Sequence, residues 1–406
     1  MDNKIESLNK NDMYNIKLII LIIIVTPFAS DSYSPSLPAI TQALHSTPNK
    51  IQLTMSLYLL GLALSQLFYG PLSDRFGRRI IILIGLVICM IGSLFCALSI
   101  SLAFILAARF IQGAGAGVCN SVFRAILRDK FVGHKMAQAG AFVGLFYTLA
   151  LAVAPIIGGY IQHYLGWRAN FIFVTMVISS IFIILTIYLP ESHLNKDPHA
   201  LRFKNIFNNY FTLFTSPVFL GYATLSSISF SGIIAYFTVA PFLLQNIVGL
   251  NAVQFGWLSL GIACGICIGQ YINIKLVLRL GTLSLLWIGL FTAFFAGLLM
   301  LAFALANIIN AWVIMVPVIL YTTAAGLVFS NANANAFHTF GHIAGIAGAV
   351  YGFLQILGST LTSILLSTLH AHSQVPLAYI FTGLGLFGLI ILYFISRTSR
   401  DIELKN

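Results

Sequence analysis

Apolar runs of about 20 residues, separated by short polar connectors, fill most of the chain. A helix rises 1.5 Å per residue, so about 20 apolar residues are needed to cross the hydrocarbon core of a bilayer. The pattern therefore predicts twelve transmembrane helices. They are expected at 17–39, 51–70, 80–98, 102–124, 137–161, 169–189, 218–243, 253–275, 283–303, 311–334, 345–369 and 377–396.

The longest interior connector, at about 191–216, is polar and leaves six predicted helices on either side of it. We therefore expect an all-α membrane protein built from two six-helix bundles. The bundles are predicted at 1–190 and 217–406, joined by a cytoplasmic linker at 191–216.

The composition agrees with a polytopic membrane protein. Of the 406 residues, 59% are hydrophobic and only 8% are charged, and the mean hydropathy is +0.95, whereas about 25% of the residues of a soluble globular protein are charged. The net charge of +11 would suggest a nucleic acid partner in a soluble protein, but here the charges lie in short connectors that face one side. We expect a lipid-embedded protein that binds no nucleic acid.

Lys and Arg define the predicted topology, because they are enriched in cytoplasmic connectors. With the N-terminus inside, all but three of the 21 basic residues fall in cytoplasmic segments; the exceptions are Lys50 and Arg168 outside and Arg109 within the membrane. Residues 1–17 could pass for the start of a signal peptide, but the apolar run that follows continues without a convincing cleavage site. We predict a retained first helix and two cytoplasmic termini.

A charged turn between the second and third predicted helices is the most distinctive stretch: Gly70-Pro71-Leu72-Ser73-Asp74-Arg75-Phe76-Gly77-Arg78-Arg79. Its glycines permit a tight turn, its aspartate can cap a helix, and its arginines hold the turn in the cytoplasm. The stretch resembles motif A of the major facilitator superfamily of transporters. Gly269 and Asn273 repeat part of it between the eighth and ninth helices, with Asn in place of Asp74, as expected of a transporter with two repeated halves.

A second stretch, Ala154–Gly159, resembles motif C, the fifth-helix signature of proton-driven antiporters in this superfamily. Pro155 kinks the helix there, and Gly158 and Gly159 allow close helix contact. Three positions at which motif C favours glycine hold alanine instead. They are Ala141, Ala150 and Ala154.

Three longer segments resemble the Bcr/CflA drug-resistance subfamily of the same superfamily. They are Ser30–Pro38, parts of Pro241–Gly256, and Ala344–Gln355. The resemblance covers nearly the whole chain and implies a twelve-helix transporter of the bacterial inner membrane that exports small organic molecules in exchange for protons. It says more about architecture than about cargo.

Asp31 is the only acidic residue inside a predicted helix, and Arg109, in a stretch that resembles motif B of the superfamily, is the only basic residue similarly placed. A charge in the membrane costs several kcal/mol unless it is paired, solvated or protonated. Both residues lie about 10 Å from the outer ends of their helices, so they can meet at one level. We predict that Asp31 carries the coupled proton and that Arg109 tunes its proton affinity; a static ion pair is the alternative.

The resemblance to motif A implies a second cluster of charges at the cytoplasmic helix ends. Asp74, Arg78 and Asp129 are expected to form a latch that is released as the two halves rock; simple anchoring of the topology is the alternative. The remaining motif A residues are assigned to the same latch. They are Gly70, Arg75, Gly77 and Arg79.

The substrate cavity is expected at the membrane midplane, between the two halves. Polar or aromatic groups in otherwise apolar helices are the candidates for its lining, with ordinary interhelical packing as the alternative for each. These candidates are Tyr33, Gln112, Asn120, Tyr147, Tyr236, Phe237, Tyr321 and Gln355. A cavity with aromatic faces and few fixed charges would suit amphipathic cargo, cationic or neutral.

No cofactor, metal site or catalytic centre is predicted. His338 and His342 are four residues apart, and His370 and His372 two apart, but no Cys or carboxylate completes a ligand set. The five cysteines lie in apolar runs and are expected to be buried and unpaired, and the CxxC of Cys264 and Cys267 is expected to serve small-residue helix packing.

We therefore predict a monomeric, proton-coupled exporter of small organic molecules, with protons and a small-molecule substrate as its partners. One alternative is a dedicated exporter of a metabolite such as a siderophore or an amino-acid derivative. Another is a proton symporter that imports a nutrient, which motif C disfavours. A membrane-embedded enzyme would need a cluster of acids or histidines at one interface, and the sequence does not contain one.

Overall fold

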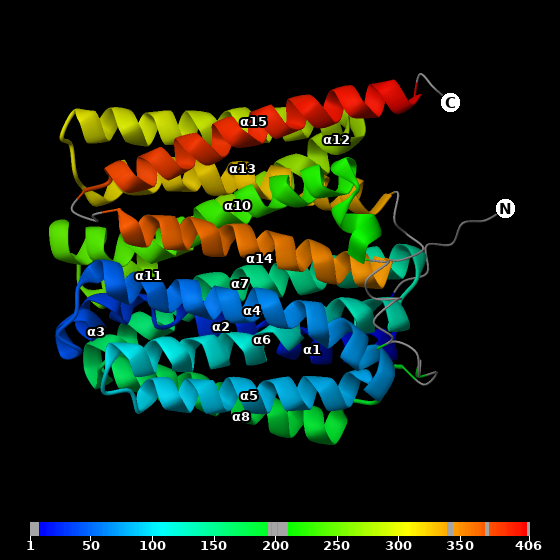
Figure 1. Ribbon diagram of the computed structural model, residues 1–406, viewed down its shortest axis with the longest axis horizontal. Coiled ribbons are helices and arrows are strands. Elements are labelled where there is room, and N and C mark those ends of the chain that lie inside the picture. Colours follow the sequence, from blue (N-terminus) through cyan, green and yellow to red (C-terminus); the bar gives the residue numbers. More distant parts are fainter. Residues whose placement is uncertain are drawn as a thin grey trace.

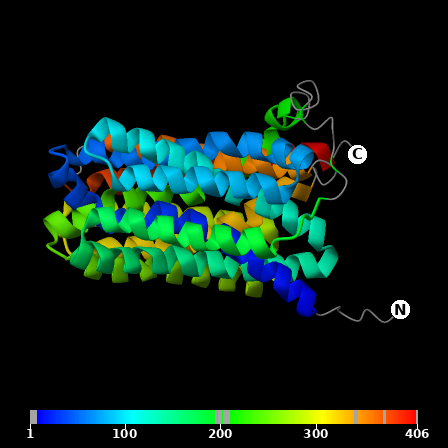
Figure 2. The ribbon, with the colours of Figure 1, turned by 90° about the horizontal axis from the view of Figure 1, so that it is seen from below.

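The structure is a computed structural model that describes the backbone of residues 8–193, 196, 201, 210–338, 344–369 and 373–403. In this part of the chain the regular structure is helical, and the long helices run side by side along the longest axis of the molecule (Figure 1). Helix α1 begins and helix α15 ends at the same end of the bundle (Figures 1 and 2). We call this the basic end and the other the opposite end.

The first half holds five long helices and one broken helix. The long helices are α4 (Pro48–Phe76), α5 (Arg78–Ala97), α6 (Leu102–Lys130), α7 (Gly133–Leu165) and α8 (Trp167–Tyr188). The broken helix consists of α1 (Lys10–Ile23), α2 (Val25–Asp31), the short helix η1 (Ser34–Ser36) and α3 (Leu37–Ala43).

The broken helix is the first membrane span, and its prolines explain the interruptions. Pro27 cannot donate the hydrogen bond that would continue α1 past Ile23, and Pro35 and Pro38 lie at the starts of η1 and α3. Asp31 is the last residue of α2. The carboxyl therefore lies where the regular helix is interrupted.

The second half contains α10 (Pro217–Phe242), the π-helical turn η2 (Leu243–Ile247), α11 (Ala252–Leu258), α12 (Leu260–Leu305), α13 (Ala311–His338), α14 (Ala344–Thr368) and α15 (Val375–Glu403). Helix α12 contains two spans, because Gly281 has a positive φ of 75° and interrupts it. The eleven long apolar segments of the described chain therefore make twelve spans, as predicted.

Several helices extend beyond the predicted apolar runs. Helix α6 continues six residues past the predicted end at 124, and α4 begins before 51 and ends after 70. A helix of 29 residues is about 43 Å long, enough to cross the headgroup layers as well as the hydrocarbon core. Hydropathy detects only the part of a helix that lies in hydrocarbon, and this explains the difference.

The two halves meet chiefly along two pairs of helices, α4 with α14 and α7 with α11. The segment between the halves is described only at 191–193, 196, 201 and 210–216, so the predicted boundaries of the two bundles and the linker stay a prediction. The expectation that all cysteines are buried is wrong for Cys264 and Cys267, which are exposed on α12. Hydrophobicity alone does not distinguish a lipid-facing position from a packed one.

Candidate functional site

A cavity of about 660 Å³ lies between the two halves. The first half contributes residues of α1, α6 and α7, and the second half contributes residues of α10, α12, α13 and α14. Cavities of 300–1,000 Å³ hold drug-sized ligands. Arg128 and Met136, both exposed, lie at its mouth toward the basic end.

The cavity wall is mainly apolar, with a small number of polar groups. Aromatic side chains contribute from both halves: Phe123, Tyr147, Phe230, Phe329 and Phe337. The polar and charged residues are Asn120, Arg124, Arg128, Thr148, Ser229, Gln270, Asn333 and Gln355. A wall of this kind can bind the apolar body of a ligand and also fix its orientation through hydrogen bonds.

Three of the eight predicted substrate residues, Asn120, Tyr147 and Gln355, line this cavity. The other five do not line it in this conformation, and each is buried among neighbouring helices. These five are Tyr33, Gln112, Tyr236, Phe237 and Tyr321.

The buried tyrosines of the second half show why residue type alone does not predict which side chains line the cavity. Tyr321 donates its hydroxyl to the carbonyl of Ile228 at 2.8 Å and stacks on Phe381 with ring centroids 4.2 Å apart. Tyr236 stacks on Phe255. A backbone carbonyl on a neighbouring helix satisfies the hydroxyl of Tyr321 without any ligand, so interhelical packing accounts for it in this conformation.

Asp31 is 1% exposed, so its side chain does not face lipid. Its Oδ1 atom has no hydrogen-bond partner among the described residues. No ion pair within 4.0 Å joins the side chains of Asp31 and Arg109, both of which the structure describes. The direct pair considered from the sequence is therefore not formed in this conformation.

Arg109 is completely buried and is held by carbonyl oxygens and aromatic faces. Its Nη1 atom donates to the carbonyl of Ala29 at 2.9 Å and to Oε1 of Gln112 at 2.6 Å. The guanidinium carbon lies 4.1 Å from the ring centroid of Tyr33 and 4.3 Å from that of Tyr58. Cation–π contacts and carbonyls stabilise the charge, while the Nη2 atom has no partner in the described structure.

A line of polar groups connects the cavity with this arginine. Asn120, in the cavity wall, accepts a hydrogen bond from the Thr26 hydroxyl at 3.1 Å. The carbonyl of Thr26 accepts the Tyr58 hydroxyl at 3.3 Å, and the Tyr58 ring lies against Arg109. The cavity and the buried charges are thus joined by direct contacts rather than separated by an apolar layer.

Hydrogen bonds between the halves close the opposite end. Ser34 donates to the carbonyl of Phe237 at 3.3 Å, and Gln245 donates to the carbonyl of Pro35 at 3.0 Å. Asn49 reaches the carbonyl of Leu369 at 3.4 Å. Two of these three contacts involve the interrupted first span, which also contains Asp31.

The motif C residues form close helix contacts near this closure. A Cβ atom at Gly158 would collide with the carbonyl oxygen of Ser32, and one at Gly159 with that of Ala252 in α11. The carbonyl of Pro155 lies against Gly256 of α11. The motif therefore packs α7 against the first span and against the second half at the same level.

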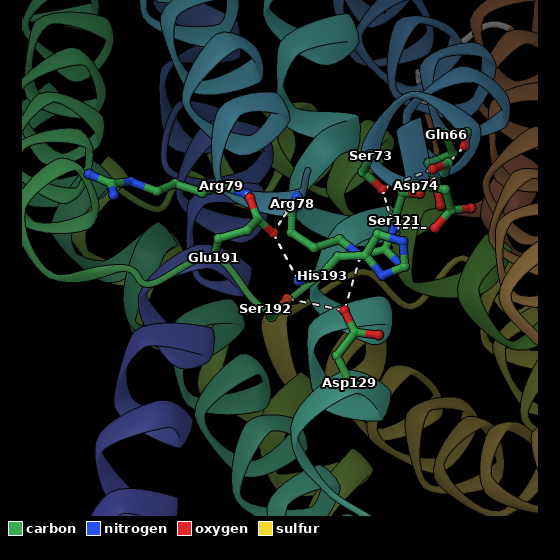
Figure 3. A network of polar contacts seen from close by, with 11 residues as sticks. Gln66, Ser73, Asp74, Arg78, Arg79, Ser121, Asp129, Glu191, Ser192 and His193 are labelled. Atoms are coloured by element: carbon green, nitrogen blue, oxygen red, sulfur yellow. Dashed lines mark hydrogen bonds and ion pairs between the residues drawn. The ribbon is translucent and has the colours of Figure 1, made fainter. Parts of the chain in front are cut away.

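A cluster of charged residues lies at the basic end (Figure 3). The Arg78 guanidinium contacts Asp74 at 2.5 Å and Asp129 at 3.1 Å, and donates to the Ser73 hydroxyl at 2.6 Å. Arg78 is buried, whereas the Asp74 side chain is 38% exposed. The predicted grouping of Asp74, Arg78 and Asp129 thus links α4, α5 and α6, all within the first half.

The other motif A residues have separate contacts. Gly77 has a φ of 105°, a conformation that favours glycine. Arg79 donates to the carbonyl of Thr186, and the Arg75 guanidinium lies over the Phe76 ring. Gly70 faces α14, since a Cβ atom there would lie 3.7 Å from that of Ala349.

Glu191, which sequence reasoning did not select, completes the cluster from beyond the end of α8 (Figure 3). Its two carboxylate oxygens accept the backbone N–H groups of Arg78 at 2.9 Å and Arg79 at 3.2 Å. These are the first N–H groups of α5, whose N-cap residue is Gly77 and has no side chain to cap them. A glycine N-cap before two arginines is the signal that could have suggested a cap supplied from elsewhere.

Arg124 is the second residue that the sequence reasoning missed. It was counted among the cytoplasmic residues, but it lies on α6 and lines the cavity, where its Nη1 donates to the carbonyl of Gly348 at 2.9 Å. Arg109 as the only basic residue inside the membrane stays a prediction, and Arg124 is a further basic side chain that lines the cavity. Arg124 is four residues from both Asn120 and Arg128, so all three lie on one helix face. This spacing is the sequence signal that could have suggested a cavity-lining role for Arg124.

The degenerate repeat of motif A in the second half forms an uncharged contact instead. Asn273 accepts a hydrogen bond from Asn331 at 2.6 Å.

The paired histidines lie outside the residues whose side chains the structure describes: His338, His342, His370 and His372.

Comparison with known families identifies this architecture. The family model described as Major Facilitator Superfamily matches residues 19–363. The chain belongs to the major facilitator superfamily. The predicted family and the twelve-helix fold are thereby confirmed, and the superfamily is one of transporters rather than enzymes.

Curated relatives match this superfamily member over nearly its whole length. A bicyclomycin resistance protein homolog of Haemophilus influenzae is 27% identical over 386 residues, which are 95% of this chain and 96% of that protein. Multidrug resistance protein D of Escherichia coli is 29% identical, with 94% and 95% covered. A chloramphenicol resistance protein of Pseudomonas aeruginosa is 26% identical, with 91% and 88% covered.

Among solved structures, the xylose transporter XylE from E. coli, in a partially occluded inward open conformation, superposes with a TM-score of 0.75. The match covers 95% of this chain and 98% of XylE at 14% sequence identity, which shows the shared fold. The long apolar helices and the bacterial relatives indicate a multi-pass protein of the inner membrane.

Proposed function

We propose that this transporter exports small organic molecules from the bacterial cytoplasm in exchange for protons. The observation that carries the proposal is a 660 Å³ cavity between the halves, closed at the opposite end and connected by polar contacts to the Arg109 pocket near Asp31. The relatives named for resistance to bicyclomycin and chloramphenicol support drug-like molecules as cargo.

The topology in this proposal places the basic end and both termini in the cytoplasm. The excess of Lys and Arg in the connectors at that end supports this orientation. With this orientation the cavity mouth at Arg128 and Met136 faces the cytoplasm, and the conformation is the one that loads cargo. Rocking of the halves would open the other end and release the cargo outside.

Asp31 is the proposed carrier of the coupled proton. A buried carboxylic acid costs less free energy than a buried carboxylate, so the closed pocket of this conformation suits the protonated side chain. Separation of the Ser34–Phe237 contact, three residues beyond Asp31, would open the pocket toward the outside. Asp31 would then take up a proton from the outside. After the return to the present conformation, Arg109, held beside the same segment through the carbonyl of Ala29, would favour the ionised form and release of the proton toward the cytoplasm as its own contacts shift.

The energy available is sufficient for concentrative export. One proton entering the cell yields about 2.3 kcal/mol per 100 mV of membrane potential, and about 1.36 kcal/mol more per pH unit. A hundredfold gradient of a neutral molecule costs about 2.7 kcal/mol. One proton per molecule is therefore enough, and we propose that a single chain performs the cycle, since it holds both the cavity and Asp31.

Everted membrane vesicles test this function directly. We expect an acidic lumen to drive uptake of bicyclomycin or chloramphenicol, and addition of either compound to release protons from the lumen. Vesicles without the protein give the background. A nutrient importer would instead use the opposite proton gradient, and a dedicated metabolite exporter would transport neither drug; either result would reject drug export.

A further inference from the structure

Two arginines, but no acidic residue, lie in the described wall of the cavity. Arg124 and Arg128 are one helical turn apart on α6, with Asn120 one turn deeper. The described residues that line the opposing wall, on α10, α12, α13 and α14, offer only neutral polar groups: Ser229, Gln270, Asn333 and Gln355. The fixed charge of the described cavity wall is therefore positive.

Arg124 is the deeper of the two and has spare hydrogen-bonding capacity. In the described structure it forms one hydrogen bond, which its Nη1 atom donates to the carbonyl of Gly348 on α14, in the second half, at 2.9 Å. A guanidinium has five N–H donors in a planar fork that matches the geometry of an anionic oxygen group. Most of this capacity is free to bind an oxyanion that enters the cavity.

The two carboxylates of the charged cluster at the basic end are engaged with a different arginine. Asp74 and Asp129 both contact Arg78, and Asp129 also accepts a hydrogen bond from Ser192. Neither forms an ion pair within 4.0 Å with Arg124 or Arg128 among the described residues. Because a partly desolvated cation without a counter-ion is costly, an anionic ligand would gain binding energy there.

We infer that the cavity binds amphipathic organic anions, with the anionic group on Arg124 and the apolar body against the phenylalanine side chains of the wall. This inference rests on the proposed function and narrows its cargo: the aromatic, weakly charged cavity expected from the sequence suggested cationic or neutral molecules, whereas the described wall disfavours cations. Arg128, exposed at the mouth, raises the local concentration of anions before they reach Arg124.

Equilibrium dialysis of the full chain in detergent micelles, with protein-free micelles as the blank, tests the inference with three matched probes. The probes are naphthalene-1-sulfonate, its neutral sulfonamide, and the 1-naphthylmethylammonium cation. For the unaltered protein we expect the sulfonate to bind at least about tenfold more tightly than the ammonium ion. Equal binding of the two, or no sulfonate binding at millimolar concentration, would overturn the inference.

Variants at one position then assign the effect to Arg124. Arg124→Gln should weaken sulfonate binding about tenfold and leave sulfonamide binding within about twofold, whereas Arg124→Lys should keep the preference for the anion. Lys130→Gln, on the same helix but outside the cavity wall, is the matched control and should change neither affinity. Equal weakening of sulfonate and sulfonamide by Arg124→Gln would show a structural role and reject the inference.

Arg128→Gln provides a second variant at an exposed position, should Arg124→Gln fail to fold. It should weaken sulfonate binding about two- to fivefold without affecting the sulfonamide; an unchanged sulfonate affinity would contradict the inference. Dialysis needs no gradient, so its outcome is independent of the vesicle experiment. Anion binding without proton exchange would leave the inference intact and reject the proposed function. Drug–proton exchange without a preference for anions would support the proposed function and reject the inference.

Discussion

At the scale of single residues, Asp74 and Glu191 lie in one cluster but stabilise different contacts. Asp74 pairs with Arg78 through its side chain, whereas Glu191 binds the backbone of α5. The pairing can change between conformations, because the Asp74 side chain is partly exposed. The contact of Glu191 with the start of α5 lies within the first half, so it can stay the same when the two halves rock.

Replacement of Asp74 by Asn removes the charge that pairs with Arg78. If the cluster is a conformational latch, turnover should fall about tenfold while the dissociation constant of the cargo stays within about twofold. Initial rates over a range of cargo concentrations in everted vesicles measure the first quantity, and dialysis measures the second. Unchanged turnover would remove the latch from the mechanism; Lys130→Gln is the control for loss of a surface charge.

Replacement of Glu191 by Gln should act on stability instead. One neutral oxygen would cap two N–H groups less well than a carboxylate, and loss of a cap costs about 1 kcal/mol. We expect a lower unfolding temperature in detergent, measured by intrinsic fluorescence, with cargo affinity unchanged. An unchanged unfolding temperature would show that the cap contributes little to folding.

The sequence identified kinds of residues but not the directions in which they point. Asn120, Tyr147 and Gln355 line the cavity, whereas Tyr321, an equally polar residue in an equally apolar helix, packs on Phe381. Arg124 was missed because a charge at the end of an apolar run looks like a connector residue. The wall of a water-filled cavity and the cytoplasm give the same local pattern in a sequence.

At the scale of helices, hydropathy was sufficient to find all twelve spans, because each needs about 20 apolar residues. It placed the connector at 276–282 that contains Gly281, but it could not find the interruption near Asp31, since this depends on proline backbone geometry rather than on hydrophobicity. The close contacts of α7 with its neighbours were predicted from a different feature of the sequence, the small residues of motif C. Gly158 and Gly159 bring backbone atoms of three helical segments together.

Gly159→Ala tests the role of this close contact. A methyl group would collide with the carbonyl of Ala252 and force α7 away from α11, so the closed opposite end should open. Spin labels at the exposed residues Leu165 and Ile308, on opposite halves, should then report a longer mean distance. Gly383→Ala, where a Cβ atom meets nothing within 4 Å, is the matched control and should leave the distance unchanged; no change in Gly159→Ala would argue against α7 as part of the closure.

At the scale of the whole molecule, the charge of the cargo determines how strongly the membrane potential drives export. Exchange of one proton for one neutral molecule moves one charge across the membrane. Exchange of one proton for one monovalent anion moves two, because the anion leaves as the proton enters. Anion binding in the positive cavity and proton transport on Asp31 would therefore both contribute to the charge that the membrane potential drives across the membrane.

This difference predicts two slopes in vesicles with an imposed potassium diffusion potential and no pH gradient. The accumulation ratio of a neutral cargo should rise tenfold per about 60 mV, and that of naphthalene-1-sulfonate tenfold per about 30 mV. Equal slopes for the two compounds would contradict either the single-proton exchange or the export of the anion in its charged form.

The most direct test of the account concerns Asp31 itself. In vesicles that contain the Asp31→Asn variant, the account predicts that a proton gradient no longer drives uptake, while exchange of labelled for unlabelled cargo continues, because the cavity is intact and only the proton carrier is lost. Uptake that still responds to the proton gradient as strongly as in the unaltered protein would contradict the central claim.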